Sequence, residues 1–395
     1  MKSKSVLKLV SAIVLAALIA IPFAAGCAAP SPAPAPAPVS TAYEEYVAGL
    51  PEGVFPVPQE CFEQAIEEGE LYVYDWVDWI PAVIYEGFEE EFGIRVTVDP
   101  LSSTDAQVAK FKLDPDTPYD ITTTGPRGYQ RLELLNVLSE LNRDWLPNLN
   151  AFISESVKKI AYSPEHPYQA PMNGSLSTYG YNKEYIDAAD PRIGSWALVF
   201  ESEEYAGRIT MTDDMFGSIG RALMYLGYSY NSIDEGELME AKEVLLRQKP
   251  WVLAYESTPK RLALEDEAWI FVWWAGNIRA LVVEYPERFG LVVPEEGSLF
   301  NIEQMHIPIG SKNRAAAHLF INYFHRPEVY IEYIKGYPSV LVNTAAVPFL
   351  PEGWEDYPEV NPGDAYLALC QPSLPIILTG KGLELRTAIW EEVKM

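Results

Sequence analysis

Two tryptophans and an aspartate stand close together early in the chain, in a pattern that could bind an organic cation. Trp76, Asp78 and Trp79 end a run of β-branched and aromatic residues that begins at residue 71, and apolar residues at helical spacing follow over 83–92. The pattern predicts a strand, a turn and a helix, and ligands of open α/β sheets bind at the carboxyl ends of strands. Aromatic faces together with carboxylates favour organic cations. The alternative is that the tryptophans belong to the core and the aspartates cap a helix.

The elements that would position these residues alternate between strands and helices. This order predicts βαβ units, parallel sheet and two α/β lobes joined by several crossings. Residues 168–181 mix small, polar and β-forming residues, as expected of an extended strand that crosses between lobes. We expect further strands at 94–99, 119–123, 208–212, 269–274, 289–294 and 306–310, and further helices at 106–112, 129–138, 218–226, 235–247 and 315–324.

Length and charge narrow the classes of partner. The chain has 395 residues, 48% of them hydrophobic and 22% charged, which is typical of a globular protein with more than one domain. The formal net charge of −27 argues against nucleic acid or an anionic membrane surface as the main partner. A cationic ligand is compatible with this charge, although acidic surfaces also simply keep proteins soluble.

The N-terminus has the features of a targeting segment. Residues 1–26 have a lysine-bearing front, an apolar run over 9–25 and small residues just before Cys27. This arrangement resembles a bacterial lipobox, which implies cleavage before Cys27, lipidation of its thiol and anchoring at the outer face of the cytoplasmic membrane, in the periplasm or at the cell surface. The alternative is an uncleaved anchor helix. We expect residues 27–66 to comprise the lipidated cysteine, a stiff Pro/Ala linker over 28–39 and a lead-in helix.

The remaining cysteines and the histidines do not indicate a cofactor. Cys61 and Cys370 could form a disulfide in an exported protein, or both could be buried thiols. The four histidines lack the spacing of a metal site, and we find no motif of a hydrolase, of a phosphate-binding loop or of a Cys/His nucleophile. We therefore expect no metal, no cofactor and no enzymatic activity.

Six collinear segments over 71–346 resemble the polyamine-binding proteins, of spermidine/putrescine type, of bacterial ABC importers. The last of them, 320–329 with 336–339, is the most diagnostic. The segments are 74–81, 119–121, 212–214 with 222–229, 274–277, 294–303, and 320–329 with 336–339.

This resemblance implies a two-lobed periplasmic-binding-protein fold of type II, in which each lobe is a mixed sheet flanked by helices. It implies that residues 67–178 and 303–344 form lobe 1 and residues 179–302 and 345–395 form lobe 2, with a hinge of several crossings. Such a protein is a monomer that closes on a small cationic ligand, a polyamine, and delivers it to an ABC permease with its ATPase.

The resemblance also implies which residues contact the ligand. Aromatic side chains would face its methylene chain and carboxylates its ammonium groups. The ligand-binding residues implied are Trp76, Trp79, Asp214, Trp274, Glu303 and Tyr337. Each has a simpler interpretation: Asp214 could cap a helix, and the aromatic residues could be ordinary packed side chains.

Several positions depart from the family pattern. Gly217 and Asn277 stand where relatives carry acids, and Asn301 stands where a tryptophan is expected. Arg127 would oppose a bound cation unless a carboxylate such as Asp78 pairs with it. Asp78, Arg127, Asn277 and Asn301 are therefore further candidate ligand residues, and the same scaffold could bind another amine, a zwitterion or an anion.

Overall fold

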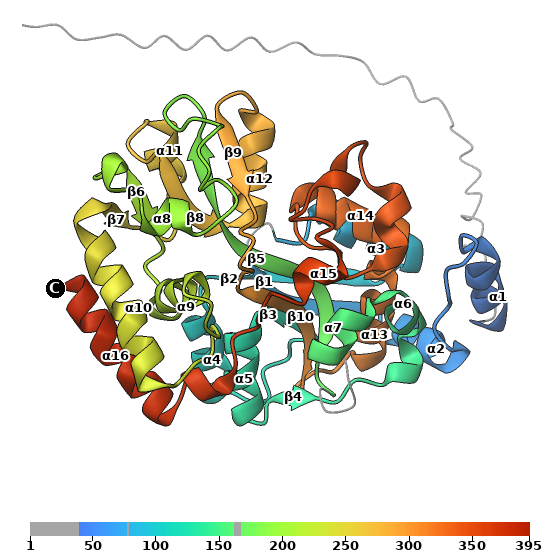
Figure 1. Cartoon of the computed structure of the whole chain (residues 1–395). Coiled ribbons are helices and arrows are strands. Elements are labelled where there is room, and N and C mark those ends of the chain that lie inside the picture. The colour runs from blue at the N-terminus through green and yellow to red at the C-terminus, as the bar shows by residue number, and fades with distance from the viewer. Residues whose placement is uncertain (1–38, 77–78, 162–166) are drawn as a thin grey trace, which may run out of the picture.

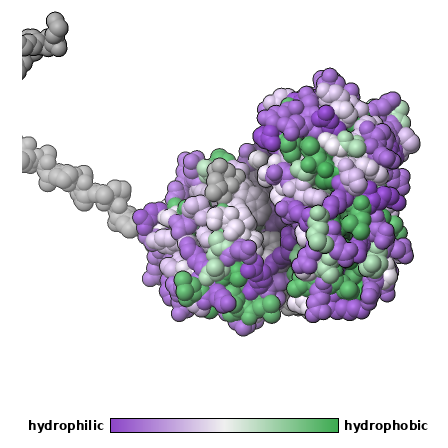
Figure 2. Space-filling model, turned by 90° about the vertical axis from the view of Figure 1, so that its left-hand side faces the viewer, coloured by the Kyte–Doolittle hydropathy of each residue, from purple (hydrophilic) through white to green (hydrophobic). Residues whose placement is uncertain are grey.

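The computed structural model describes residues 39–76, 79–161 and 167–395, and it arranges them as two lobes side by side (Figure 1). The predicted signal segment, Cys27 and Asp78 lie outside the described residues. Among the helices described, none combines the length and the apolar character needed to cross a bilayer. Hydrophilic residues cover most of the face shown in Figure 2, and the surface is hollowed between two masses.

The strands of both lobes join in one sheet of order β2-β1-β3-β10-β5-β8-β6-β7, with β4 on β10 and β9 on β5. The pairs of β1 with β2 and β3, and of β6 with β7 and β8, are parallel. The strands are β1 (Glu70–Trp76), β2 (Arg95–Leu101), β3 (Ile121–Thr124), β4 (Leu138–Ser139), β5 (Ala170–Asn182), β6 (Ile209–Met211), β7 (Val252–Tyr255), β8 (Ile270–Trp274), β9 (Phe289–Val292) and β10 (Phe300–Pro308).

Two long antiparallel strands connect the lobes. β10 pairs with β3 of the first lobe, β5 pairs with β8 and β9 of the second, and β5 and β10 pair with each other. All residues of β5 are buried, which confirms the prediction of a crossing strand over 168–181. The register of the β5–β10 pair shifts between Glu303 and Gln304.

Helices cover the first lobe on both faces of its sheet. α3 presents Ile84, Tyr85, Phe88 and Phe92 to the core and ends at Gly93, whose φ of 67° is the left-handed conformation that glycine adopts readily. The first-lobe helices up to β5 are α1 (Val39–Gly49), α2 (Gln59–Glu68), α3 (Ala82–Phe92), α4 (Thr104–Leu113), α5 (Pro126–Leu134), η1 (Arg143–Trp145), α6 (Pro147–Phe152) and α7 (Glu155–Ala161).

The second lobe has a separate core, in which Trp196 is completely buried. Its helices are α8 (Ala197–Phe200), η2 (Glu203–Tyr205), α9 (Met215–Tyr225), α10 (Glu235–Gln248), η3 (Lys249–Trp251), α11 (Lys260–Leu264) and α12 (Ala275–Glu284).

After β10 the chain returns to the first lobe and then ends on the second. Trp354, Tyr357 and Tyr366 pack against the core of the first lobe, and Ile389 and Val393 of α16 lie in the core of the second. The predicted lobe boundaries themselves stay a prediction. The elements of this part are α13 (Arg314–Phe324), α14 (Pro327–Gly336), η4 (Thr344–Phe349), η5 (Trp354–Asp356), α15 (Gly363–Leu367), η6 (Pro375–Ile377) and α16 (Gly380–Lys394).

Two predicted elements differ from the structure. The helix predicted over 129–138 ends at Leu134, because Asn136 takes a φ of 53° and turns the chain into β4. The strand predicted over 306–310 is the end of the longer β10. Cys61 is buried, Cys370 is partly buried, and both are free thiols.

A buried aspartate ties the sheet of the first lobe to α13. Asp120 is completely buried and its carboxylate accepts hydrogen bonds from the backbone N–H of Tyr72 (2.9 Å), the Ser311 hydroxyl (2.8 Å), and the backbone N–H groups of Lys312 (3.1 Å) and Asn313 (3.0 Å). A buried carboxylate is tolerated only with such partners.

Asp120→Ala should therefore lower the free energy of unfolding by about 3 kcal/mol, because it leaves several buried donors without an acceptor. Urea denaturation measures this change. Asp116→Ala, at an exposed position in the preceding loop, is the matched control and should change stability by less than about 0.5 kcal/mol. Equal stability of the two variants would contradict the structural role given to Asp120.

Candidate functional site

A cavity of about 520 Å³ lies where the two lobes meet, within the size range of small-molecule sites. The structure brings five of the six predicted ligand-binding residues to its wall, together with two of the further candidates. The residues that line it are Trp76, Trp79, Thr104, Gly125, Pro126, Arg127, Gly128, Ser175, Trp274, Asn301, Glu303 and Tyr337.

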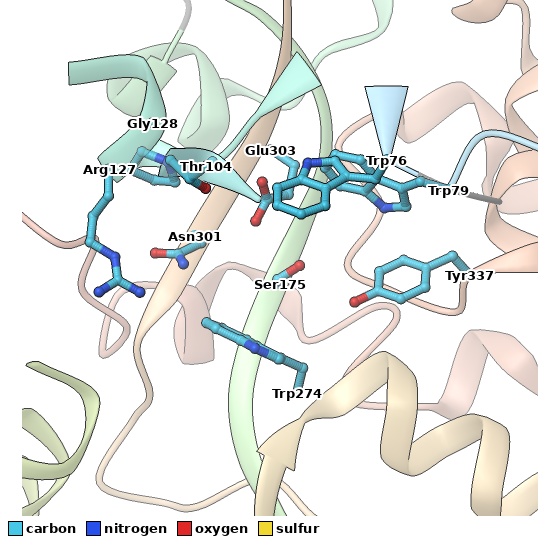
Figure 3. A pocket seen from close by; sticks show the side chains of 12 residues that line it. Trp76, Trp79, Thr104, Arg127, Gly128, Ser175, Trp274, Asn301, Glu303 and Tyr337 are labelled. Carbon is cyan, nitrogen blue, oxygen red and sulfur yellow. The ribbon is translucent and has the colours of Figure 1, made fainter. Parts of the chain in front are cut away.

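Strand ends position the aromatic walls. Trp76 is the last residue of β1. Its ring packs edge to face against that of Trp79, with the two ring centres 6.4 Å apart. Trp274 ends β8 and precedes α12, and it faces these two tryptophans from the opposite side of the cavity, while Tyr337 follows α14 (Figure 3). Burial raises the pKa of Tyr337 to about 12, which keeps its hydroxyl neutral.

Glu303 supplies the carboxylate of the cavity. It lies on β10 opposite Asn173, at the position where the ladder shifts register, and such bulges re-aim side chains. The carboxylate lies against Gly125, where an added Cβ would lie 2.7 Å from it, so a larger residue at this position would require the carboxylate to shift. Among the residues that the structure describes, no group donates a hydrogen bond to Glu303. Burial raises its pKa to about 7, and the positive charge of Arg127 opposes this rise.

Asp75, the residue before Trp76, differs from Glu303 in its hydrogen-bond partners. Asp75 is 1% exposed and accepts hydrogen bonds from the hydroxyl groups of Thr123 and Tyr85. Burial raises its pKa to about 6, and these hydrogen bonds oppose the rise. Asp75 therefore has partners within the protein, whereas Glu303 does not.

Asn301 adds a second acceptor without a partner. Its side-chain oxygen is buried, and it accepts no hydrogen bond from the described part of the chain. Buried polar atoms without partners are rare in folded proteins and are costly. An unpartnered amide oxygen and a carboxylate on one wall favour a ligand that brings N–H donors, as an ammonium does.

Of the remaining candidates within the described residues, only Arg127 lines the cavity. Arg127 lines the cavity at the end away from Tyr337, and it pairs with Asp214, its Nη1 lying 3.2 Å from Oδ1 of Asp214 (Figure 3). Asp214 precedes α9 but its side chain makes no capping hydrogen bond, and it does not line the cavity. Asn277 lies on α12, away from the wall. The roles of all these residues in ligand binding stay predictions.

No pattern in the sequence indicated Thr104 or Ser175 as residues of the site. Ser175 is a small polar residue within the crossing strand, where its neighbours look alike, and Thr104 opens α4. The loop 124–128 carried a visible signal, because glycines and a proline interrupt the end of β3. Within the described residues, no group of three or more acidic, histidine or cysteine side chains is placed to hold a metal ion.

The raised pKa of Glu303 makes stability depend on pH. An acid whose pKa is raised by folding binds more protons in the folded state than in the unfolded state. Its contribution to the free energy of unfolding is therefore complete below its ordinary pKa of 4.5 and is lost as pH rises through about 7. Glu303→Gln should therefore raise the free energy of unfolding by about 1–2 kcal/mol at about pH 8 and by much less at about pH 5. Urea denaturation at both pH values measures this, with the exposed Glu295→Gln as control. An equal effect of Glu303→Gln at both pH values would contradict the assignment.

Comparisons with known proteins place the chain in a family. The model of the family described as "Bacterial extracellular solute-binding protein" matches residues 84–362. The spermidine/putrescine-binding periplasmic protein of Salmonella typhimurium is 30% identical over 280 residues, which are 70% of this chain and 78% of that protein. The putrescine/cadaverine-binding protein of Pseudomonas aeruginosa is 25% identical over 348 residues, which are 84% of this chain and 95% of that protein.

A solved structure gives the same result for the fold. The substrate-binding protein of a spermidine/putrescine ABC transporter from Streptococcus pneumoniae superposes with a TM-score of 0.76 at 23% identity, over 82% of this chain and 98% of that chain. This likeness confirms the predicted two-lobed periplasmic-binding-protein fold. The chain thus belongs to the bacterial extracellular solute-binding protein family, and it is an exported protein of the solute-binding class.

Proposed function

We propose that the protein captures a polyamine, a putrescine- or spermidine-like cation, in the cavity between its lobes and delivers it to an ABC permease. The observation that carries this proposal is the carboxylate of Glu303, which has no hydrogen-bond donor among the described residues and lines the cavity together with three tryptophans and a tyrosine. The relative from Salmonella typhimurium is a spermidine/putrescine-binding protein and that from Pseudomonas aeruginosa a putrescine/cadaverine-binding protein, which supports the same class of ligand.

The chemistry of the wall suits such a ligand. A polyamine is a chain of methylene groups with ammonium groups along it, so it needs flat faces and acceptors in alternation. A contact of a cation with an aromatic face contributes about 0.5–2 kcal/mol, and a hydrogen bond to a charged group about 1.5–3 kcal/mol. In this proposal Trp76, Trp79, Trp274 and Tyr337 contact the methylene chain, and Glu303 and Asn301 accept from an ammonium.

The N-terminal sequence indicates where in the cell the protein would act. Cys27 would carry the lipid that holds the protein at the outer face of the cytoplasmic membrane, and residues 28–39 would space the lobes from it. The monomer would close by motion of the two lobes about the β5–β10 crossing and dock on the permease, whose ATPase drives uptake. It would act by binding alone, without chemistry on the ligand.

A second candidate ligand is a zwitterion or an anion, because Arg127 lines the same cavity. The ion pair with Asp214 counts against it, since the guanidinium charge is already compensated.

Titration of the chain lacking residues 1–38 with putrescine and spermidine tests the proposal. We expect saturable binding, seen as a change in tryptophan fluorescence and a rise in Tm, because a ligand at a hundred times its Kd stabilises by about 2.7 kcal/mol. Trp274→Ala should weaken binding by about 3- to 30-fold through loss of its aromatic face. Trp390→Phe, on α16, is the matched control and should bind as the wild type does. Absence of binding by any polyamine would overturn the proposed ligand class.

A further inference from the structure

Arg127 connects the two lobes at one end of the cavity. It belongs to α5 of the first lobe, and Asp214, 87 residues later in the sequence, directly precedes α9 of the second. The guanidinium carbon also lies 5.7 Å from the ring centre of Phe216 on the same helix. Both side chains of the pair are partly exposed, at 45% for Arg127 and 21% for Asp214. The contact is therefore an ion pair at the rim of the cleft.

A second guanidinium faces Asp214 from within the second lobe. Arg221, on α9, is 2% exposed and donates hydrogen bonds to the hydroxyl groups of Ser177 (2.7 Å) and Thr212 (2.8 Å). Burial lowers the pKa of Arg221, and the negative charge of Asp214 opposes this effect. A Cβ at Gly217 would lie 2.8 Å from Oδ2 of Asp214 and 3.0 Å from Nη2 of Arg221, so both groups meet at this glycine.

These contacts leave Asp214 with little charge to offer a ligand. Of the carboxylates in the described part of the chain, only Glu303 lines the cavity. A ligand ammonium that approached Asp214 would meet the guanidinium of Arg127, and like charges repel. The arrangement gives the cavity a central anionic group, Glu303, and a cationic group, Arg127, at the end away from Tyr337 (Figure 3).

We propose that Arg127 is a specificity-determining residue. Its guanidinium occupies the position beside Asp214 that a second ammonium group of the ligand would otherwise take. The cleft then binds amines through one ammonium at Glu303, and additional ammonium groups add little affinity. The favoured ligands are short amines with a single anchored ammonium, and longer triamines are disfavoured. This inference rests on the proposed binding of amines in the cavity and refines its ligand class.

Calorimetric titration with n-butylamine, putrescine and spermidine tests the inference. It is performed at about pH 8.5, above the pKa of about 7 of Glu303 in the wild type. In the wild type, putrescine should bind at most about threefold more tightly than butylamine. In Arg127→Gln, putrescine and spermidine should gain about tenfold in affinity through the freed Asp214, while butylamine changes by less than about twofold.

Two further proteins serve as controls. Arg127→Gln combined with Asp214→Asn should lose the gain, because the freed carboxylate is removed. Arg131→Gln, on the same helix, removes an arginine of almost equal exposure, 46%, that pairs with Asp105 within the first lobe, and it should bind as the wild type does. Thermal denaturation shows whether each variant is folded.

The outcomes separate the two proposals. An unchanged ratio of putrescine to butylamine affinity in Arg127→Gln would overturn the inference alone and leave amine binding intact. Loss of affinity for all three amines in Arg127→Gln would also overturn it, since Arg127 would then assist binding. If no folded protein bound any amine, the proposed function would fall and the inference with it.

Discussion

The antiparallel ladder of β5 and β10 is the interaction on which the rest of the structure depends. It is the one place in the sheet where strands paired with the first lobe meet strands paired with the second, so it sets the position of both lobes. The register shift between Glu303 and Gln304 lies within this ladder. The cavity is therefore built around the same backbone that joins the lobes, and its central acid lies on one of the two strands of this ladder.

The acids of the first lobe and the acid of the cavity differ in whether the protein supplies them with hydrogen-bond donors. Asp75 and Asp120 are satisfied by hydroxyl or backbone donors of the protein, and they stabilise the strands that carry the site. Glu303 lacks such donors in the described chain, and the charge of Arg127 only partly opposes the effect of burial on its pKa. Such a group costs stability in the empty protein, as is common at binding sites, and in the proposed function a bound cation would offset this cost.

The sequence predicted the fold class and most elements, because alternating strand and helix patterns and the glycine after α3 act locally. It also predicted five residues that meet at one cavity. The pattern at the end of a strand indicated Trp76 and Trp79, and the resemblance implied Trp274, Glu303 and Tyr337. The ion pair of Arg127 with Asp214 could not be predicted, because it joins two lobes whose approach depends on the whole fold. The early end of α5 was missed because Val137 and Leu138 continue the apolar pattern while Asn136 turns the backbone.

The pKa of Glu303 has a consequence for the charge balance of the cleft. Near neutrality the carboxyl carries a proton for part of the time when the cavity is empty. A bound ammonium would displace that proton, so amine and proton would compete for one site and loading would exchange one cation for another. With Arg127 already balancing Asp214, the cleft would remain close to electroneutral both empty and loaded, and acidic surroundings would favour release of the ligand.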